Sequence, residues 1–194
     1  MWHKRVLTIL FSALFVLGFF HNTYADEIEQ KFKDVCVALA KESSQTISPT
    51  GKENAVSDKE IEETFTRQRK LFKEWQEELR GLIKTSPQSI WADDAQYIIS
   101  ALSIEDPKQN AIELELVLSN YPDIKIEDWT KENLLLLLPS KLDEQIVRLE
   151  LCSLYKQLGE TEKLNNLAEE SIKKFPEKTE LFQEMLNRKS IRSI

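Results

Sequence analysis

Histidine, glycine and cysteine are all scarce in this chain. Its 194 residues include two histidines, four glycines and two cysteines. Both histidines, His3 and His21, lie within residues 1–25, together with Gly18. If that segment is removed, no histidine remains, which excludes a Ser-His or Cys-His catalytic triad and a His-ligated metal site. The glycines that remain are far apart, so a glycine-rich phosphate loop is excluded as well.

Basic residues are outnumbered by acidic ones. The chain has 33 acidic and 26 basic residues, a net charge of -7. Residues 1–25 contain Lys4 and Arg5 but no acidic residue, so their removal moves the net charge to -9. Such an acidic chain is not expected to bind nucleic acid. Hydrophobic residues make up 41% of the sequence, enough for a core, and the length indicates roughly one domain.

The first 25 residues have the organisation of a signal peptide. A short basic stretch precedes an apolar run from Val6 to Phe20, and Thr23 and Ala25 offer small residues where a signal peptidase reads the chain. We therefore expect residues 1–25 to be cleaved and the mature protein to be exported to the periplasm. The alternative is a retained anchor, although this run is shorter than the roughly 20 residues of a membrane-spanning helix. Membrane association would require that alternative.

The two cysteines, Cys36 and Cys152, leave two states open. An exported chain meets an oxidising compartment, in which they could pair as a disulfide. Each also lies among apolar neighbours, where a free cysteine packs as a small hydrophobe. They are too far apart for a Cys-x-x-Cys redox motif. Cys36 lacks the cleavage context of a lipoprotein, so no lipid anchor is expected.

Three segments precede the main part of the chain. Residues 26–42 place apolar side chains at helical intervals and are predicted to form an amphipathic helix. Residues 43–57 are polar, contain Pro49 and Gly51, and are predicted to be a flexible linker. A capping box at Ser57 and Glu60 then predicts the start of a long helix over residues 58–85.

The long predicted helix has a heptad seam. Its seam positions alternate in spacing between four and three residues and are Ile61, Phe65, Gln68, Phe72, Trp75, Leu79 and Leu82. A glutamine and three aromatic rings fit poorly between two identical helices, so packing against the rest of the same chain is favoured. Assembly of an oligomer through residues 61–82 is the alternative. The charges between the seam positions alternate in sign, which is typical of a solvated face.

An internal repeat occupies residues 86–190. Two segments end alike, in Tyr121-Pro122-Asp123 and in Phe175-Pro176-Glu177, and each follows two amphipathic stretches with a short polar break. Both units are predicted to be helical hairpins. Because a hairpin cannot bury its apolar face alone, the hairpins are expected to stack as a short all-α solenoid.

The second unit resembles a tetratricopeptide repeat. Leu151, Tyr155 and Pro176 match positions of that 34-residue pattern, and Gly159 falls at its turn. Arg148 stands where the pattern has a large aromatic residue. The resemblance implies a fold of stacked helical hairpins that bind another protein or a peptide.

The start of the first unit is similar to repeats of bacterial envelope proteins. Residues 87–97, which include Asp93, Asp94 and Tyr97, resemble the Pro-x-Ser-x-x-Ala-Asp-Asp-Ala-x-Tyr opening in outer-membrane assembly lipoproteins of the BamD type and in the periplasmic Tol-Pal coordinator. The resemblance implies a role in cell-envelope or outer-membrane assembly. The residues themselves indicate a helix start, since Ser89 can cap it and two aspartates favour its first turn.

Two further helices are expected beside the hairpins. Residues 127–138, with Trp129 and a run of five leucines, are predicted to form a helix that ends before Pro139. A last amphipathic helix is predicted to cover the open end of the array with Leu181, Phe182, Met185 and Leu186.

These patterns predict a protein-protein interaction scaffold without a cofactor and without enzymatic activity. No pair or triad of side chains has a spacing typical of catalysis. In tetratricopeptide arrays the first helix of each hairpin lines a concave groove, and the resemblance carries this role to seven positions. They are Gln96, Ser100 and Ser103 in the first unit and Leu149, Ser153, Lys156 and Gln157 in the second. A partner is expected to engage this groove through extended backbone hydrogen bonds and modest apolar contact.

Overall fold

A computed structural model describes residues 27–42, 58–134 and 143–187. Over these ranges the chain forms α-helices and one short 3-10 helix, without a β-strand, so the predicted all-α class is confirmed. Three predicted features lie outside the described residues. They are the signal-like residues 1–25, the linker 43–57 with Ser57 of the predicted capping box, and residues 135–138 of the leucine run. Within the described part, no helix is long and apolar enough to cross a membrane.

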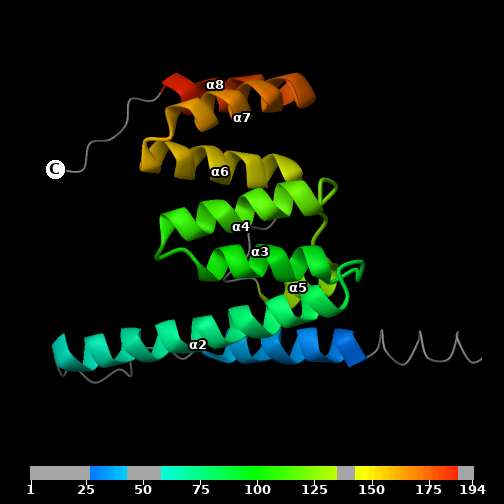
Figure 1. Ribbon diagram of the computed structural model, residues 1–194, viewed down its shortest axis with the longest axis vertical. Helices are drawn as coiled ribbons and strands as arrows, with labels where there is room; N and C mark the ends of the chain where they lie inside the picture. Colours follow the sequence, from blue (N-terminus) through cyan, green and yellow to red (C-terminus); the bar gives the residue numbers. More distant parts are fainter. Residues whose placement is uncertain (1–26, 43–57, 135–142, 188–194) are drawn as a thin grey trace, which may run out of the picture.

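The helices are stacked along the longest axis of the molecule (Figure 1). A helix over residues 27–42, here called the N-terminal helix, lies alongside α2 at one end of the stack, and α8 lies at the other end. Neighbouring helices pack in the order α2, α3, α4, α6, α7 and α8. Their bounds are α2 Asp58–Thr85, α3 Ala92–Leu102, α4 Pro107–Asn120, α5 Asp128–Asn133, α6 Glu144–Leu158, α7 Thr161–Lys174 and α8 Thr179–Asn187, with η1 at Pro176–Lys178.

Local sequence signals explain several of the helix ends. The Asp106 side chain accepts hydrogen bonds from the backbone N–H groups of Lys108 and Gln109, and Pro107 fits the first position of α4. The Asp143 side chain caps α6 in the same way, through the N–H of Ile146. Gly159 ends α6 with φ of +74°, a conformation that favours glycine. The predicted turn at Gly159 is therefore confirmed.

One continuous apolar core runs through the stack. Each helix contributes the stripe of side chains that its sequence periodicity indicates. The largest of the fully buried side chains are Phe32, Leu39, Leu79, Ile98, Ile99, Leu114, Ile126, Leu134, Leu151 and Phe182. Phe182 on α8 closes the core at the end opposite the N-terminal helix.

The seam of α2 packs against its own chain over the second half of the helix. Leu79 is fully buried, and Phe72, Trp75 and Leu82 pack against the core. Phe65, two turns before Phe72, is 48% exposed, and the first turns of α2 project beyond the stack (Figure 1). Assembly of an oligomer through this seam stays an alternative prediction.

The helix predicted over residues 127–138 is shorter in the structure. α5 ends at Asn133, and Leu134 is a buried, non-helical residue that follows it. α5 packs beside the N-terminal helix and the start of α3, since the Trp129 ring lies 6.4 Å from Phe32 and 6.2 Å from Trp91. Trp129 and Leu134 are thus part of the core, whereas residues 135–138 of the leucine run lie outside the described residues.

Candidate functional site

The three groove residues predicted on α3 are buried. Gln96 donates a hydrogen bond of 2.8 Å from Nε2 to Oε2 of Glu113, and Ser100 donates one of 2.7 Å to the carbonyl of Tyr97. Ser103 donates to the carbonyl of Ile99 at 2.9 Å. The three side chains are therefore buried and hydrogen-bonded within the chain, and their role in binding a partner stays a prediction.

The physical reason is that α2 and α4 enclose this polar stripe of α3. Gln76 of α2 donates from Nε2 to Oγ of Ser103 at 2.8 Å and to the carbonyl of Ile99 at 3.2 Å. Arg80 of α2 and Gln109 of α4 both donate to Oε1 of the buried Glu113, each at 2.7 Å. The side chains that a groove would offer to a partner are thus satisfied within the chain.

The four residues predicted on α6 have different environments. Ser153 and Gln157 are exposed, whereas Leu149 is half-buried and packs against the core. Lys156 is half-buried and donates a hydrogen bond of 2.5 Å to the carbonyl of Met185 on α8. The structure therefore does not bring all seven predicted residues onto one open surface.

Polar contacts also connect helices that are neighbours in the stack. Tyr97 of α3 donates from its hydroxyl to both carboxylate oxygens of Glu150 on α6, at 2.9 and 3.0 Å. Burial raises the pKa of Glu150, and burial together with the Glu150 carboxylate raises the pKa of the Tyr97 hydroxyl. On α6 and α7, hydrogen bonds from Lys174 and Arg148 hold the pKa of Glu144 below its usual value despite its burial. These groups join helices and are not directed at a ligand.

Cys36 and Cys152 are both free and buried, which is one of the two states that the sequence leaves open. Cys36 lies on the N-terminal helix and Cys152 on α6, and both are buried in the apolar core. Burial raises the pKa of Cys36, and it raises the pKa of Cys152 to about 11. Both thiols are therefore protonated and unreactive at neutral pH.

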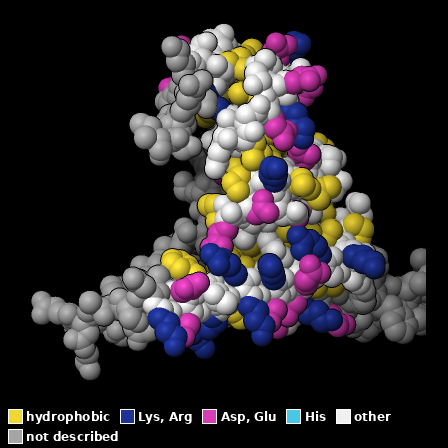
Figure 2. All heavy atoms as spheres, turned by 60° about the vertical axis from the view of Figure 1, so that its left-hand side comes forward, with side chains coloured by type: hydrophobic (Ala, Val, Ile, Leu, Met, Phe, Trp, Pro, Cys, Tyr) yellow, Lys and Arg dark blue, Asp and Glu magenta, His cyan; other side chains and the backbone are white. Residues whose placement is uncertain are grey.

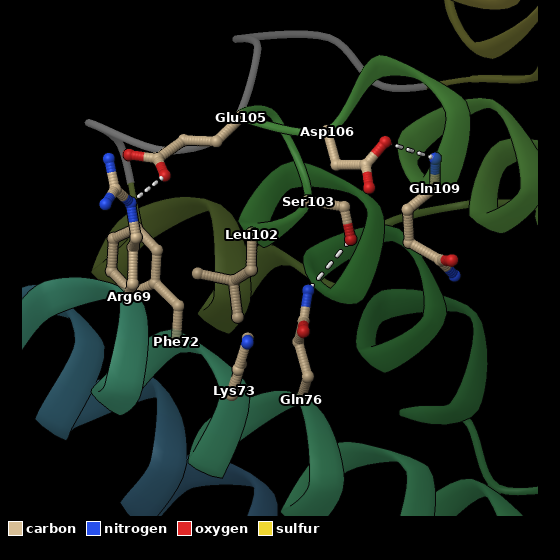
Figure 3. Close-up of a pocket in the computed structure, with 9 residues that line it drawn as sticks. All are labelled: Arg69, Phe72, Lys73, Gln76, Leu102, Ser103, Glu105, Asp106 and Gln109. Atoms are coloured by element: carbon tan, nitrogen blue, oxygen red, sulfur yellow. Dashed lines mark hydrogen bonds and ion pairs between the residues drawn. The ribbon is translucent and has the colours of Figure 1, made fainter. Parts of the chain in front are cut away.

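A pocket of about 310 Å³ lies between α2 and the turn that joins α3 to α4 (Figure 3). Four of its residues come from α2 and five from α3, the turn and α4. They are Arg69, Phe72, Lys73, Gln76, Leu102, Ser103, Glu105, Asp106 and Gln109. Ser103 is the one predicted groove residue that lines it. The volume is at the lower end of the range for ligand-binding pockets.

The pocket combines an apolar pair with opposite charges. Phe72 and Leu102 supply apolar surface, and Nε of Arg69 pairs with Oε2 of Glu105 at 2.7 Å across the mouth. Lys73 lies on the same side as Arg69 and is exposed. The ion pair is solvated on both sides, so it contributes little to stability and can be rearranged at low cost.

Two exposed apolar side chains flank the pocket along the chain. Phe65 precedes Arg69 by one helical turn and is 48% exposed, and Ile104 precedes Glu105 and is 71% exposed. Basic side chains gather over the lower part of the molecule, where α2 lies, with acidic side chains between them (Figure 2).

The lining of the pocket therefore offers both apolar contact and charged groups to a ligand. The sequence does not indicate this pocket, because the alternating charges of α2 are equally typical of a solvated face. The signal that could have pointed to it is the break at Glu105–Lys108, which brings polar residues next to a helix already rich in Arg and Lys. Among the described residues, no group of three or more potential ligand side chains is arranged to hold a metal ion.

Comparisons of the chain with family models, with curated proteins and with solved structures gave no match.

Proposed function

We propose that this protein is an interaction scaffold that binds another protein at the pocket between α2 and the α3–α4 turn. The observation that carries the proposal is the pocket itself, in which Phe72 and Leu102 adjoin two cations and two carboxylates. A peptide with an apolar side chain next to an acidic one is a suitable occupant. Its apolar group would contact Phe72, and its carboxylate would pair with Lys73.

The stacked arrangement supports a scaffold of tetratricopeptide type. Hairpins α3–α4 and α6–α7 follow one another, α8 packs on the last of them, and the N-terminal helix with α2 precedes them. Solenoids of this kind hold extended surfaces in place because each unit packs only on its neighbours. The assignment to the tetratricopeptide type rests on Leu151, Tyr155, Gly159 and Pro176, the residues that carry the resemblance.

We further propose that the protein acts in the periplasm, in assembly of the cell envelope. The support is the signal-like organisation of residues 1–25 and the similarity of residues 87–97 to envelope repeats. Intact-mass analysis of the protein from the soluble periplasmic fraction should give a chain beginning at Asp26. A full-length chain found in membranes would contradict the location and leave the pocket to be tested separately.

Lys73→Glu tests the binding site. The substitution reverses the charge of an exposed pocket residue, so it should reduce co-purification of the partner at least tenfold while leaving the helical circular-dichroism signal and the melting temperature nearly unchanged. Quantitative mass spectrometry of proteins that co-purify with the tagged full-length chain measures the effect.

Lys173→Glu is the matched control. Lys173 is an exposed lysine on α7, far along the chain from the pocket, and its replacement makes the same change of net charge. A partner retained by this variant and lost by Lys73→Glu supports the pocket. Equal loss in both variants would indicate a general charge effect and would contradict it.

A further inference from the structure

Residues 124–134, here called the latch segment, are pinned to the start of α3 by two neighbouring aspartates. The backbone N–H of Lys125 donates to Oδ2 of Asp93 at 3.2 Å. The backbone N–H of Glu127 donates to both carboxylate oxygens of Asp94, each at 3.2 Å, and the Thr130 hydroxyl also donates to Oδ2 of Asp94. A segment more than 30 residues away along the chain is thus attached through two side chains.

The latch segment covers apolar surface at the junction of α3 and the N-terminal helix. Ile124, Ile126, Thr130 and Leu134 are buried. Trp129 completes a cluster with Trp91 and Phe32, whose own rings stack at 5.1 Å. Release of the segment would therefore expose large apolar side chains on both sides of the contact.

The carboxylate of Asp94 is fully buried and is faced mainly by acidic groups. Asp93 lies beside it on α3, the side chain of Glu127 approaches from the latch segment, and the Cys36 thiol approaches from the N-terminal helix. Within the part of the chain that the structure describes, no ion pair involves Asp94. Lys33 of the N-terminal helix is occupied elsewhere, with its ammonium 5.5 Å from the Trp91 ring and 5.2 Å from the Trp129 ring.

We propose that Asp94 is a proton-operated latch, which holds residues 124–134 closed when it is protonated and loosens them when it is ionised. A protonated Asp94 can still accept the N–H of Glu127 with one oxygen while its own O–H donates to the oxygen of Thr130. An ionised Asp94 keeps these hydrogen bonds but places a negative charge in a buried site next to Asp93 and Glu127. Ionisation therefore costs free energy only while the latch is closed.

The direction of the pH dependence follows from that difference. When the latch is closed, the pKa of Asp94 is raised to about 7, and burial is the largest cause. Repulsion from Asp93 and Glu127 raises this pKa further, whereas the hydrogen bonds from Thr130 and Glu127 lower it. With the latch open, the carboxyl is solvated and has its usual pKa near 4. Closure is therefore most stable below about pH 4, weakens as the pH rises towards 7, and changes no further above that.

Hydrogen exchange of the backbone amides of Lys125 and Glu127 in the full-length protein tests the latch. After correction for the intrinsic exchange rate, their opening equilibrium constant should rise from pH 5 to pH 7, by roughly tenfold per unit at most, and level off at higher pH. The amides of Leu164 and Ala168 on α7 report the rest of the stack and should not follow this profile. A flat profile at Lys125 and Glu127, or an equal change on α7, would overturn the proposal.

Four substitutions separate Asp94 from other titrating groups. Asp94→Asn keeps an acceptor oxygen and should flatten the profile at Glu127, whereas Asp93, whose pKa burial also raises, leaves a smaller pH dependence at Lys125. Thr130→Val removes a hydrogen bond that lowers the pKa of Asp94, so the plateau should begin at higher pH, and Asp93→Asn removes a repulsion, so it should begin at lower pH. The exposed Asp123→Asn is the control and should leave the profile unchanged. A pH dependence at Glu127 that persists in Asp94→Asn, or opposite shifts that fail to appear, would assign the titration to another group and refute the latch.

Discussion

At the scale of single residues, two glycines in helical surroundings have opposite effects on stability. Gly159 has φ of +74° and ends α6, so Gly159→Ala should lower the free energy of unfolding by about 1 kcal/mol. Gly81 lies inside α2, and a Cβ there would meet no atom within 4 Å, so Gly81→Ala should raise it by up to about 1 kcal/mol. Urea unfolding followed by circular dichroism measures both. The same sign for the two variants would contradict the assignment of Gly159 to a left-handed turn.

Glu113 is the residue on which three helices converge. Its buried carboxylate accepts hydrogen bonds from Arg80 of α2, Gln96 of α3 and Gln109 of α4. Glu113→Ala should lower the free energy of unfolding by about 2–3 kcal/mol because it leaves two amides and part of a guanidinium without their acceptor. Glu62→Ala on the exposed face of α2 should change it by less than about 0.5 kcal/mol. A loss at Glu113 no larger than at Glu62 would show that the network does not hold the three helices together.

The two thiols should be unreactive until the protein unfolds. Burial keeps Cys36 and Cys152 protonated, so a thiol reagent at pH 8 should label neither in the native chain. In denaturant without a reductant, both should react. If no thiol is released under denaturing conditions, the two cysteines are joined and the free state described here is wrong.

At the scale of elements, α2 has two parts with different roles. Leu79 is fully buried in the second part, so Leu79→Ala should lower the free energy of unfolding by about 2–5 kcal/mol. Phe65 in the projecting part is 48% exposed, so Phe65→Ser should change it by less than about 1 kcal/mol. Chemical unfolding of both variants measures the difference. A large loss for Phe65→Ser would mean that the projecting turns are packed against something, such as a second copy of the chain.

Elements held by local signals could be predicted from the sequence. The spacing of Phe72, Trp75, Leu79 and Leu82 indicates which face of α2 packs inward, and Pro107 and Gly159 mark the two breaks inside the hairpins. Each of these signals acts within a few residues, where backbone sterics and helix periodicity decide the outcome.

Contacts between distant segments could not be predicted in that way. The burial of Gln96 and Ser103 depends on Arg80 and Gln76 of α2 and on Glu113 of α4. A polar stripe on a helix has the same sequence pattern whether water or another polar helix covers it. The attachment of residues 124–134 to Asp93 and Asp94 also spans more than 30 residues, so helix-start chemistry alone explained those aspartates only in part.

At the scale of the whole molecule, stacking buries the inner faces of the helices and leaves their outer faces and the turns exposed. The interior faces of α3 are taken by α2, α4 and α6 and by the latch segment. The pocket beside the α3–α4 turn escapes this burial because α2 projects past the stack there. We therefore propose that a partner binds at a turn next to a long helix, and not along an inner groove.

Site-specific photo-crosslinking in cells tests that placement most directly. A photoreactive amino acid at position 104, an exposed position beside the pocket, is compared with the same group at position 173 on α7 in the full-length protein. We predict that position 104 captures one discrete partner, that position 173 does not, and that Lys73→Glu strongly reduces the capture without loss of the folded state. Capture of the same partner from position 173 alone, or from both positions equally, would contradict the pocket as the binding site.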